Sequence, residues 1–364
     1  MQALDAIAAS NLKWLKGRTI FLTRHGSHAY GTNIATSDED FKGLAIAPKE
    51  YYLGVNQNFE QAEFKAPGPD MVIFELRKFF RLAVDCNPNI IEVLFSDPSD
   101  YLLCRPEMEM LLEKRQLFVS KRARHRFAGY AHAQLQRIQG HYRWLKDPPK
   151  SQPTRAEYGL PERTVIPSDQ LQAAEAVIQK KVAGWNLNLS GIDESSRVEV
   201  LNDINAMLTE MFLTKDEQYR AVGSTLGYSD NFLDLLDKER KYTARQKEWK
   251  SYQDWKTNRN EKRSELEAKW GYDTKHAMHL VRLLRMCREI LETGRVLVKR
   301  PDAAELLAIR NGEWTYEQLI EWSAKQDREL GELYKNTNVI PHSPDMAAID
   351  ALCIMMVERS LSLG

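Results

Sequence analysis

The stretch Gly26-Ser27-His28-Ala29-Tyr30-Gly31, with Ser37-Asp38-Glu39-Asp40 shortly after it, combines a glycine turn with two carboxylates one residue apart. The run before it, residues 18–23, is apolar and β-branched, which predicts a strand that leads into the turn. Residues 40–47 predict a second strand, which ends at Pro48 because proline cannot donate to a strand ladder. The turn and the carboxylates therefore lie between two predicted strands.

The rest of the first third of the chain continues this alternation of strands and helices. The predicted elements are a helix over 3–16, strands over 59–65 and 70–74 with the turn Pro67-Gly68-Pro69 between them, a helix from Glu75, and a helix capped by Asn87 with Pro88 at its first position. We expect residues 1–116 to form one mixed α/β domain.

Strand signals almost disappear after that point, so we expect residues 117–364 to form a mostly α-helical domain. Prolines recur over 147–167 and predict a loop there. The expected helices cover 119–146, 169–190, 197–213, 229–269 and 273–293, one that opens with a capping box at Thr315 and Gln318, and a last one from about Pro344.

The two carboxylates Asp38 and Asp40 are candidate metal ligands. Residues i and i+2 of a strand point to the same face, so both can reach one Mg²⁺ or bridge two. Carboxylate oxygens suit Mg²⁺, with Mn²⁺ as a substitute, and such ions can activate a hydroxyl and stabilise departing pyrophosphate. A third carboxylate should lie on a neighbouring strand. Asp70 is the first choice and Glu75 the second.

The glycine turn is a candidate phosphate site. Free backbone N–H groups at Gly26 and Ser27 can hold phosphates, and Arg24 before the turn can add a charge. Each motif alone is common, and a solvated turn or strand edge is the ordinary explanation of either. In this order, after one apolar strand and before another, they favour binding of a nucleotide with a metal.

These motifs resemble those of the DNA polymerase beta nucleotidyltransferase superfamily, and in particular the predicted nucleotidyltransferases associated with RNA ligases, the RlaP-like group. The resemblance covers about residues 18–100 and 270–325. The stretches that carry it are residues 26–31, 37–43, 76–79, 87–92 and Gly271-Tyr272-Asp273-Thr274-Lys275-His276-Ala277-Met278-His279. It implies an α+β chain, with a polymerase-beta-like palm that holds Ser27, Asp38 and Asp40 at the nucleotide and metal. His28 departs from the arginine of many relatives.

The predicted helix from Lys275 carries a polar stripe beside its buried face. Lys275, His279 and Arg282 follow i, i+4 and i+7, so they can hold a triphosphate or an RNA phosphate, or form a salt-bridged surface. His276 and His279 are three residues apart, a spacing that suits a metal, although no third ligand is evident. Residues 238–263 hold ten basic and four acidic residues with interleaved aromatics, which predicts either RNA binding or a solvated helix with packed aromatics.

Bulk composition excludes several classes of protein. The 364 residues include 51 basic and 51 acidic ones, so nucleic acid would have to meet a local basic face. The four cysteines lie far apart and predict neither a disulfide framework nor a zinc site. No secretory leader and no membrane span are evident, so we expect a cytoplasmic protein.

Together these features predict an Mg²⁺-dependent nucleotidyltransferase that binds ATP or another NTP. The expected acceptor is an RNA end, and an RNA ligase or another repair protein is the expected partner. One alternative keeps the same site with a protein or small-molecule hydroxyl as acceptor. Another is a non-catalytic nucleotide- or RNA-binding component of an RNA-repair assembly. The sequence does not distinguish which NTP is used, how many nucleotides are added or which oligomeric state forms.

Overall fold

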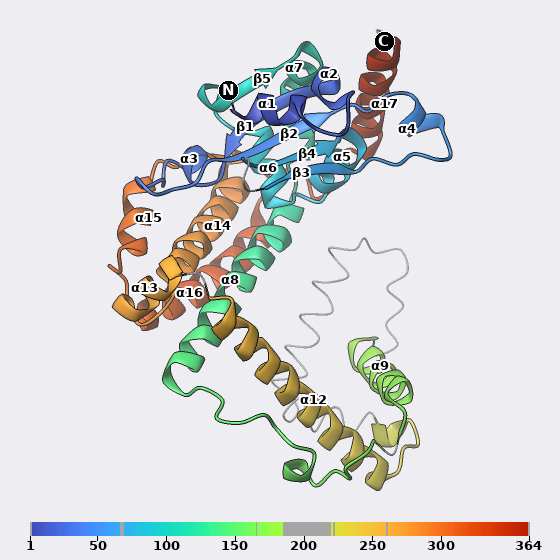
Figure 1. The fold of residues 1–364 in the computed structure, drawn as a ribbon, viewed down its shortest axis with the longest axis vertical. Helices are drawn as coiled ribbons and strands as arrows, with labels where there is room; N and C mark the ends of the chain where they lie inside the picture. Colours follow the sequence, from blue (N-terminus) through green and yellow to red (C-terminus); the bar gives the residue numbers. More distant parts are fainter. Residues whose placement is uncertain are drawn as a thin grey trace. The chain divides into compact units, whose positions relative to one another are not determined.

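One mixed five-stranded sheet organises the N-terminal part of the protein, in the order β3-β4-β2-β1-β5 (Figure 1). The computed structural model describes residues 2–65, 69–164, 166–184, 220, 223–259 and 261–362. The strands are β1 (Thr19–His25), β2 (Asp40–Ala45), β3 (Gln61–Phe64), β4 (Asp70–Glu75) and β5 (Tyr101–Cys104). The first four confirm the strands expected from the sequence, whereas β5 is not among the expected elements. Most of the turn expected at Pro67-Gly68-Pro69 lies outside the described residues.

The strand pairing brings the ends of three strands together. β1 runs antiparallel to β2 and β5, and β3 runs antiparallel to β4. β2 and β4 run parallel, so both begin at the same edge of the sheet. The end of β1 meets that edge because β1 is antiparallel to β2.

Helices cover the sheet and supply its hydrophobic core. Near the strands are α1 (Gln2–Ala8), α2 (Leu15–Arg18), α3 (Gly26–Tyr30), α4 (Glu50–Leu53), α5 (Leu76–Val84), α6 (Pro88–Leu94) and α7 (Pro106–Glu113), with 3-10 turns η1 (Pro98–Asp100) and η2 (Arg115–Phe118). One face packs against α5, α6 and later helices, and the other packs against α1 and α2. In β2, Leu44 belongs to the core on the α6 face, whereas Phe41 and Ala45 belong to the core on the other face. Because alternate residues of a strand share a face, the Asp40 side chain lies on the α6 face with Leu44.

Helix boundaries in this region follow local capping signals. The Glu75 side chain accepts from the Lys78 N–H and begins α5, and the Asn87 side chain accepts from the Asn89 N–H and begins α6.

The single helix expected over 3–16 is wrong, because α1 and α2 are separate helices with turns over residues 9–14 between them. The polar residues Ser10 and Asn11 lie at this break, and the Leu12 N–H donates to the Ser10 Oγ at 3.1 Å. Such side chains compete with the helix for backbone hydrogen bonds, which explains why the helix is interrupted here.

The later part of the chain is helical, which agrees with the prediction. Its helices are α8 (Arg122–Lys146), α9 (Ser168–Gly184), α12 (Asp230–Thr257), α13 (Glu261–Trp270), α14 (Thr274–Thr293), α15 (Ala303–Arg310), α16 (Tyr316–Asn336) and α17 (Met346–Ser362), with a 3-10 turn η3 (Ala156–Tyr158). The capping box of Thr315 and Gln318 is present at the start of α16. The helix expected over 229–269 is divided into α12, which ends at the C-cap Asn258, and α13. The expected helix over 197–213 and the end of the one over 169–190 lie outside the described residues.

The fold class is α+β, which confirms the sequence-based expectation. Two compact units divide the chain: unit 1 comprises Met1–Tyr142 and Lys262–Gly364, and unit 2 comprises Arg143–Glu261. The main core of unit 1 joins residues from both of its segments. The domain boundary expected at residue 116 stays a prediction. No helix in the described part of the chain has the length and apolar character that crossing a bilayer requires.

Candidate active site

The glycine turn closes directly against the second aspartate. Gly26 follows β1 with a φ of 67°, and a Cβ at this position would lie 2.2 Å from the Asp40 Oδ2. Gly31 ends α3 at a φ of 72°, and the Thr32 N–H returns to the Ser27 carbonyl at 2.9 Å. Only a residue without a Cβ can bring the backbone of residue 26 so close to the carboxylate.

The strand register sets two of the predicted carboxylates beside each other. Asp40 pairs with Asp70 on the parallel strand β4 and with His25 on β1. Asp38 lies in the irregular segment just before β2, so the i, i+2 relation of a strand does not apply to it. Glu75 pairs with Ala45 at the other end of β4, about 16 Å along the strand from Asp70. Of the two candidates for the third carboxylate, Asp70 is therefore the one beside Asp40.

The charges around Asp40 form a set that suits a divalent cation. Partial burial raises the pKa of Asp40, and the carboxylates of Asp70 and Asp38 raise it further. Lys42 and Lys275 act in the opposite direction. Asp38, Asp40 and Asp70 offer the hard oxygen ligands that Mg²⁺ prefers, and a metal ion at these carboxylates stays a prediction.

Lys42 is a site residue that the sequence motifs alone do not mark. It follows Asp40 by two residues on the same face of β2, and its Nζ donates to the Asn89 Oδ1 at 3.1 Å. Burial lowers the pKa of Lys42 to about 8. The sequence could have indicated Lys42, because alternate residues of a strand share one face and Lys42 lies between Asp40 and Leu44 in that series.

Behind Lys42 lies a buried polar network that joins distant parts of unit 1. The Tyr30 hydroxyl donates to the Glu92 Oε2 at 2.5 Å, and His25 Nε2 lies 3.4 Å from the same oxygen. Arg282 of α14 pairs with the Glu92 Oε1, and its guanidinium lies 3.8 Å from the centre of the Tyr30 ring. Arg282 is thus buried against Glu92, while the phosphate contact expected of it stays a prediction.

The start of α14 brings cations toward the carboxylates. Burial lowers the pKa of Lys275, with Arg263 and Arg310 adding to the effect, and the charges of Asp273 and Asp40 oppose it. Burial also lowers the pKa of His279 well below its usual range, so that side chain is neutral. Of the three residues of the expected stripe, Lys275 is a cation whose charge interacts with Asp40, whereas Arg282 pairs with Glu92. The phosphate contact expected of His279 stays a prediction.

Arg24 lies at the edge of this region. Its Nε donates to the Glu39 Oε1 at 3.3 Å, and 44% of its side chain is exposed. Both partners are well exposed, so the pair contributes little stability. The phosphate contact expected of Arg24 stays a prediction.

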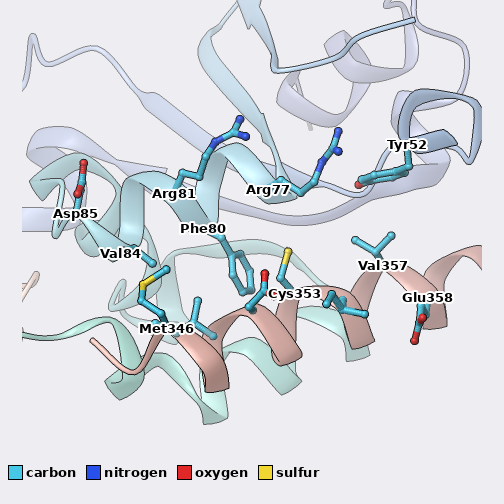
Figure 2. A pocket seen from close by; sticks show the side chains of 13 residues that line it. Tyr52, Arg77, Phe80, Arg81, Val84, Asp85, Met346, Cys353, Val357 and Glu358 are labelled. Atoms are coloured by element: carbon cyan, nitrogen blue, oxygen red, sulfur yellow. The ribbon is translucent and has the colours of Figure 1, made fainter. Parts of the chain in front are cut away.

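A separate groove of about 660 Å³ lies between α5 and α17 (Figure 2). In Figure 2, Phe80 points from α5 toward α17, and Arg77 and Arg81 line the rim. Arg77 also contacts Glu75 at 3.5 Å and covers the Tyr52 ring. The residues that line this groove include none of the three candidate carboxylates, so it is distinct from the candidate active site.

The basic segment of unit 2 has its aromatics packed together. The ring centroids of Trp255 and Tyr252, both on α12, lie 5.5 and 5.8 Å from that of Trp144. The Tyr242 ring packs against Tyr158. The packed arrangement is the second of the two interpretations considered for these aromatics. The lysines between them, Lys247, Lys250 and Lys256, are exposed.

Comparison with known proteins finds a family match in the N-terminal region. Residues 1–147 match the RlaP family, described as an RNA repair pathway DNA polymerase beta family. The match confirms the resemblance in the region that holds the glycine turn and all three aspartates. At the level of the family, RlaP supports a nucleotidyltransferase-type role and a link to RNA. The second stretch of the resemblance, residues 270–325, lies beyond the RlaP match.

A curated relative is similar over a short region. An uncharacterized 38.9 kDa protein of Enterobacteria phage T4 is 28% identical over 89 residues, which cover 22% of this chain. The match spans about a quarter of the phage protein's length, 26%. No solved structure matches this chain.

Proposed function

We propose that the protein is a metal-dependent nucleotidyltransferase that transfers a nucleotide from an NTP to a hydroxyl at an RNA end. The observation that carries the proposal is the register that pairs Asp40 with Asp70, together with the closure of Gly26 against Asp40. The RlaP match over the same residues supports this class of reaction.

The proposed reaction uses the carboxylates at the edge of the sheet. The acceptor hydroxyl oxygen forms a bond to the α-phosphorus of the NTP, the bond from that phosphorus to the bridging oxygen breaks, and pyrophosphate leaves. Asp70, on the strand beside Asp40, would take the hydroxyl proton. Mg²⁺ held by Asp38, Asp40 and Asp70 would supply charge neutralisation and activation of the hydroxyl.

The negative charge of the triphosphate needs cations and backbone donors. Backbone N–H groups at Gly26 and Ser27 can hold one phosphate. Lys275 is close enough to Asp40 for the two charges to interact, and Arg310 interacts with Lys275. We propose these two cations as phosphate ligands, with Arg24 at the exposed edge. For Arg282, pairing with Glu92 favours a positioning role.

Two alternatives keep parts of this proposal. The acceptor can be a protein or small-molecule hydroxyl, in which case the site is the same and only the acceptor surface differs. Alternatively, the chain binds nucleotide or RNA without catalysis in a repair assembly. Exposed lysines on α12 would give RNA phosphates a charged surface to contact, although the aromatics beside them are packed.

Each labelled NTP, with Mg²⁺ or Mn²⁺ and total tRNA, tests the proposal. We expect label on RNA, and a loss of about 100-fold or more in rate for Asp40→Asn. Asp5→Asn, at an exposed carboxylate on α1, is the matched control and should retain the rate. Label on protein alone would support the other acceptor. If nothing is labelled and Asp40→Asn binds NTP as well as the wild type, the catalytic proposal is wrong.

A further inference from the structure

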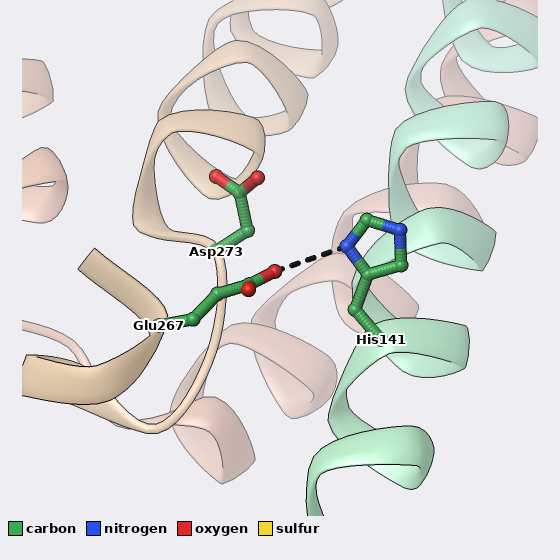
Figure 3. A group of neighbouring side chains, drawn as sticks. All are labelled: His141, Glu267 and Asp273. Carbon is green, nitrogen blue, oxygen red and sulfur yellow. Dashed lines mark hydrogen bonds and ion pairs between the residues drawn. The ribbon is translucent and has the colours of Figure 1, made fainter. Parts of the chain in front are cut away.

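Three potential metal ligands converge where α8, α13 and α14 of unit 1 meet (Figure 3), and a fourth, His276, lies beside Asp273. His141 comes from α8, Glu267 from α13, Asp273 is the N-cap of α14, and His276 lies in the first turn of α14. In Figure 3 the Glu267 carboxylate points to His141, and its Oε1 lies 3.1 Å from the His141 Nδ1. One ligand atom from each of His141, Glu267 and Asp273 lies within 4.8 Å of the others.

The fourth group, His276, completes a two-histidine, two-carboxylate set. Its Nε2 lies 3.8 Å from the Asp273 Oδ2, and its ring centroid lies 6.3 Å from that of His141. In a tetrahedral site with bonds of about 2.0–2.1 Å, neighbouring ligand atoms are about 3.3 Å apart. The His141–Glu267 pair already meets that spacing, whereas Asp273 and His276 would have to move closer for all four groups to bind one ion.

Burial distinguishes this cluster from a surface group of acids. Glu267 is 2% exposed and Asp273 is fully buried. A buried carboxylate is costly unless it is paired or coordinates a metal. Asp273 also caps α14, because its Oδ1 accepts from the His276 N–H at 2.9 Å, while its Oδ2 lies next to Arg263 and the His276 ring.

Arg263 is the group that competes with a metal ion. Its Nη1 lies 3.3 Å from the Asp273 Oδ2 and also contacts His276. About a third of its side chain, 35%, is exposed, so the arginine can turn toward solvent. The alternative occupant of the cluster is therefore the Arg263 guanidinium itself.

We propose that His141, Glu267, Asp273 and His276 bind one divalent transition-metal ion, with Zn²⁺ as the ion of best fit. Imidazole nitrogens favour Zn²⁺ and similar ions over Mg²⁺. This site is separate from the palm carboxylates, which offer oxygen ligands alone. The ion would join α8 and α13, next to the points where the chain leaves unit 1 after Tyr142 and re-enters it at Lys262. It would also hold the first turn of α14, which carries Lys275.

Metal analysis of the untagged full-length protein tests the proposal. After loading with Zn²⁺ and dialysis, we expect about one ion per chain, and loading with Co²⁺ should give the visible absorption of a tetrahedral site. Glu267→Gln and His141→Gln should weaken binding by at least about 10-fold. Asp40→Asn should bind Zn²⁺ like the wild type, which separates this site from the proposed active site.

The Arg263→Met variant distinguishes a cluster that binds a metal ion from one that is occupied by the Arg263 guanidinium. If the cluster is a metal site, this variant should bind Zn²⁺ at least as tightly as the wild type, because a competing cation has been removed. Wild-type protein without stoichiometric Zn²⁺ and without a tetrahedral Co²⁺ spectrum would overturn the proposal. So would a His141→Gln variant that is folded and binds the ion with unchanged affinity.

Discussion

The Asp40 carboxylate lies against the Cα of Gly26, so close that a Cβ on residue 26 would come within 2.2 Å of the Asp40 Oδ2. The contact links the glycine turn to the carboxylate cluster, two features separated by the segment 27–39. It gives a physical reason for a glycine at this position, because both the positive φ and the lack of space require it.

Gly26→Ala should therefore impair the active site more than the fold. Since the added Cβ must displace Asp40, we expect a loss of about 100-fold in nucleotidyl transfer, with the secondary structure retained. Gly17→Ala is the matched control, because a Cβ at Gly17 meets nothing within 4 Å. Circular dichroism and the labelled-NTP rate measure the two effects. An active Gly26→Ala enzyme would show that Asp40 need not hold this position.

Removing one member of the Glu92–Arg282 pair should destabilise unit 1. Arg282→Met leaves the Glu92 carboxylate buried without its cation, at a cost of about 3–5 kcal/mol. The double variant Arg282→Met with Glu92→Gln should recover part of that loss, since no unpaired charge remains. Urea unfolding of the single and double variants measures the coupling. Independent, additive effects would contradict the inferred pairing.

Folding stability should fall with acid through His25. Burial and the charge of Lys42 lower the pKa of His25 to about 4, with Arg282 acting in the same direction and the nearby Glu92 opposing them. The unfolded state therefore takes up a proton near pH 6.5 that the folded state takes up only near pH 4. Above pH 6.5 His25 is neutral in both states and costs no stability. As the pH falls from 6.5 to 4, the free energy of unfolding decreases by up to about 3 kcal/mol.

The measurement for His25 is the free energy of unfolding in urea at several pH values from neutral to acid. His25→Gln should flatten the curve between pH 6.5 and pH 4. A variant with the same slope as the wild type would assign the acid sensitivity to other groups.

Three exposed lysines of α12 should contribute to RNA affinity. Neutralising Lys247, Lys250 and Lys256 to Gln should weaken binding of single-stranded RNA and reduce its salt slope by about 2. The matched triple control uses lysines that are exposed elsewhere, Lys13, Lys16 and Lys49. Fluorescence anisotropy at several salt concentrations gives both quantities. Equal affinities for the two triple variants would leave α12 a solvated helix.

Much of the local structure is predictable because its signals are local. Short apolar runs bounded by turn residues identify β1 to β4, and single residues such as Glu75, Asn87 and Thr315 mark where helices begin. The break between α1 and α2 and the short strand β5 are not predictable in the same way. In both cases the apolar spacing of a few residues fits more than one secondary structure.

Local sequence signals specify the α+β order, the glycine turn and the identity of the carboxylates, because periodicity and turn chemistry act over a few residues. Which of these groups meet depends on tertiary packing. The fold pairs Asp40 with Asp70 rather than with Glu75, buries Arg282 against Glu92, and brings His141 to Glu267. These partners are separated by 30, 190 and 126 residues, respectively, and the packing of helices and strands, which no local pattern specifies, brings them into contact.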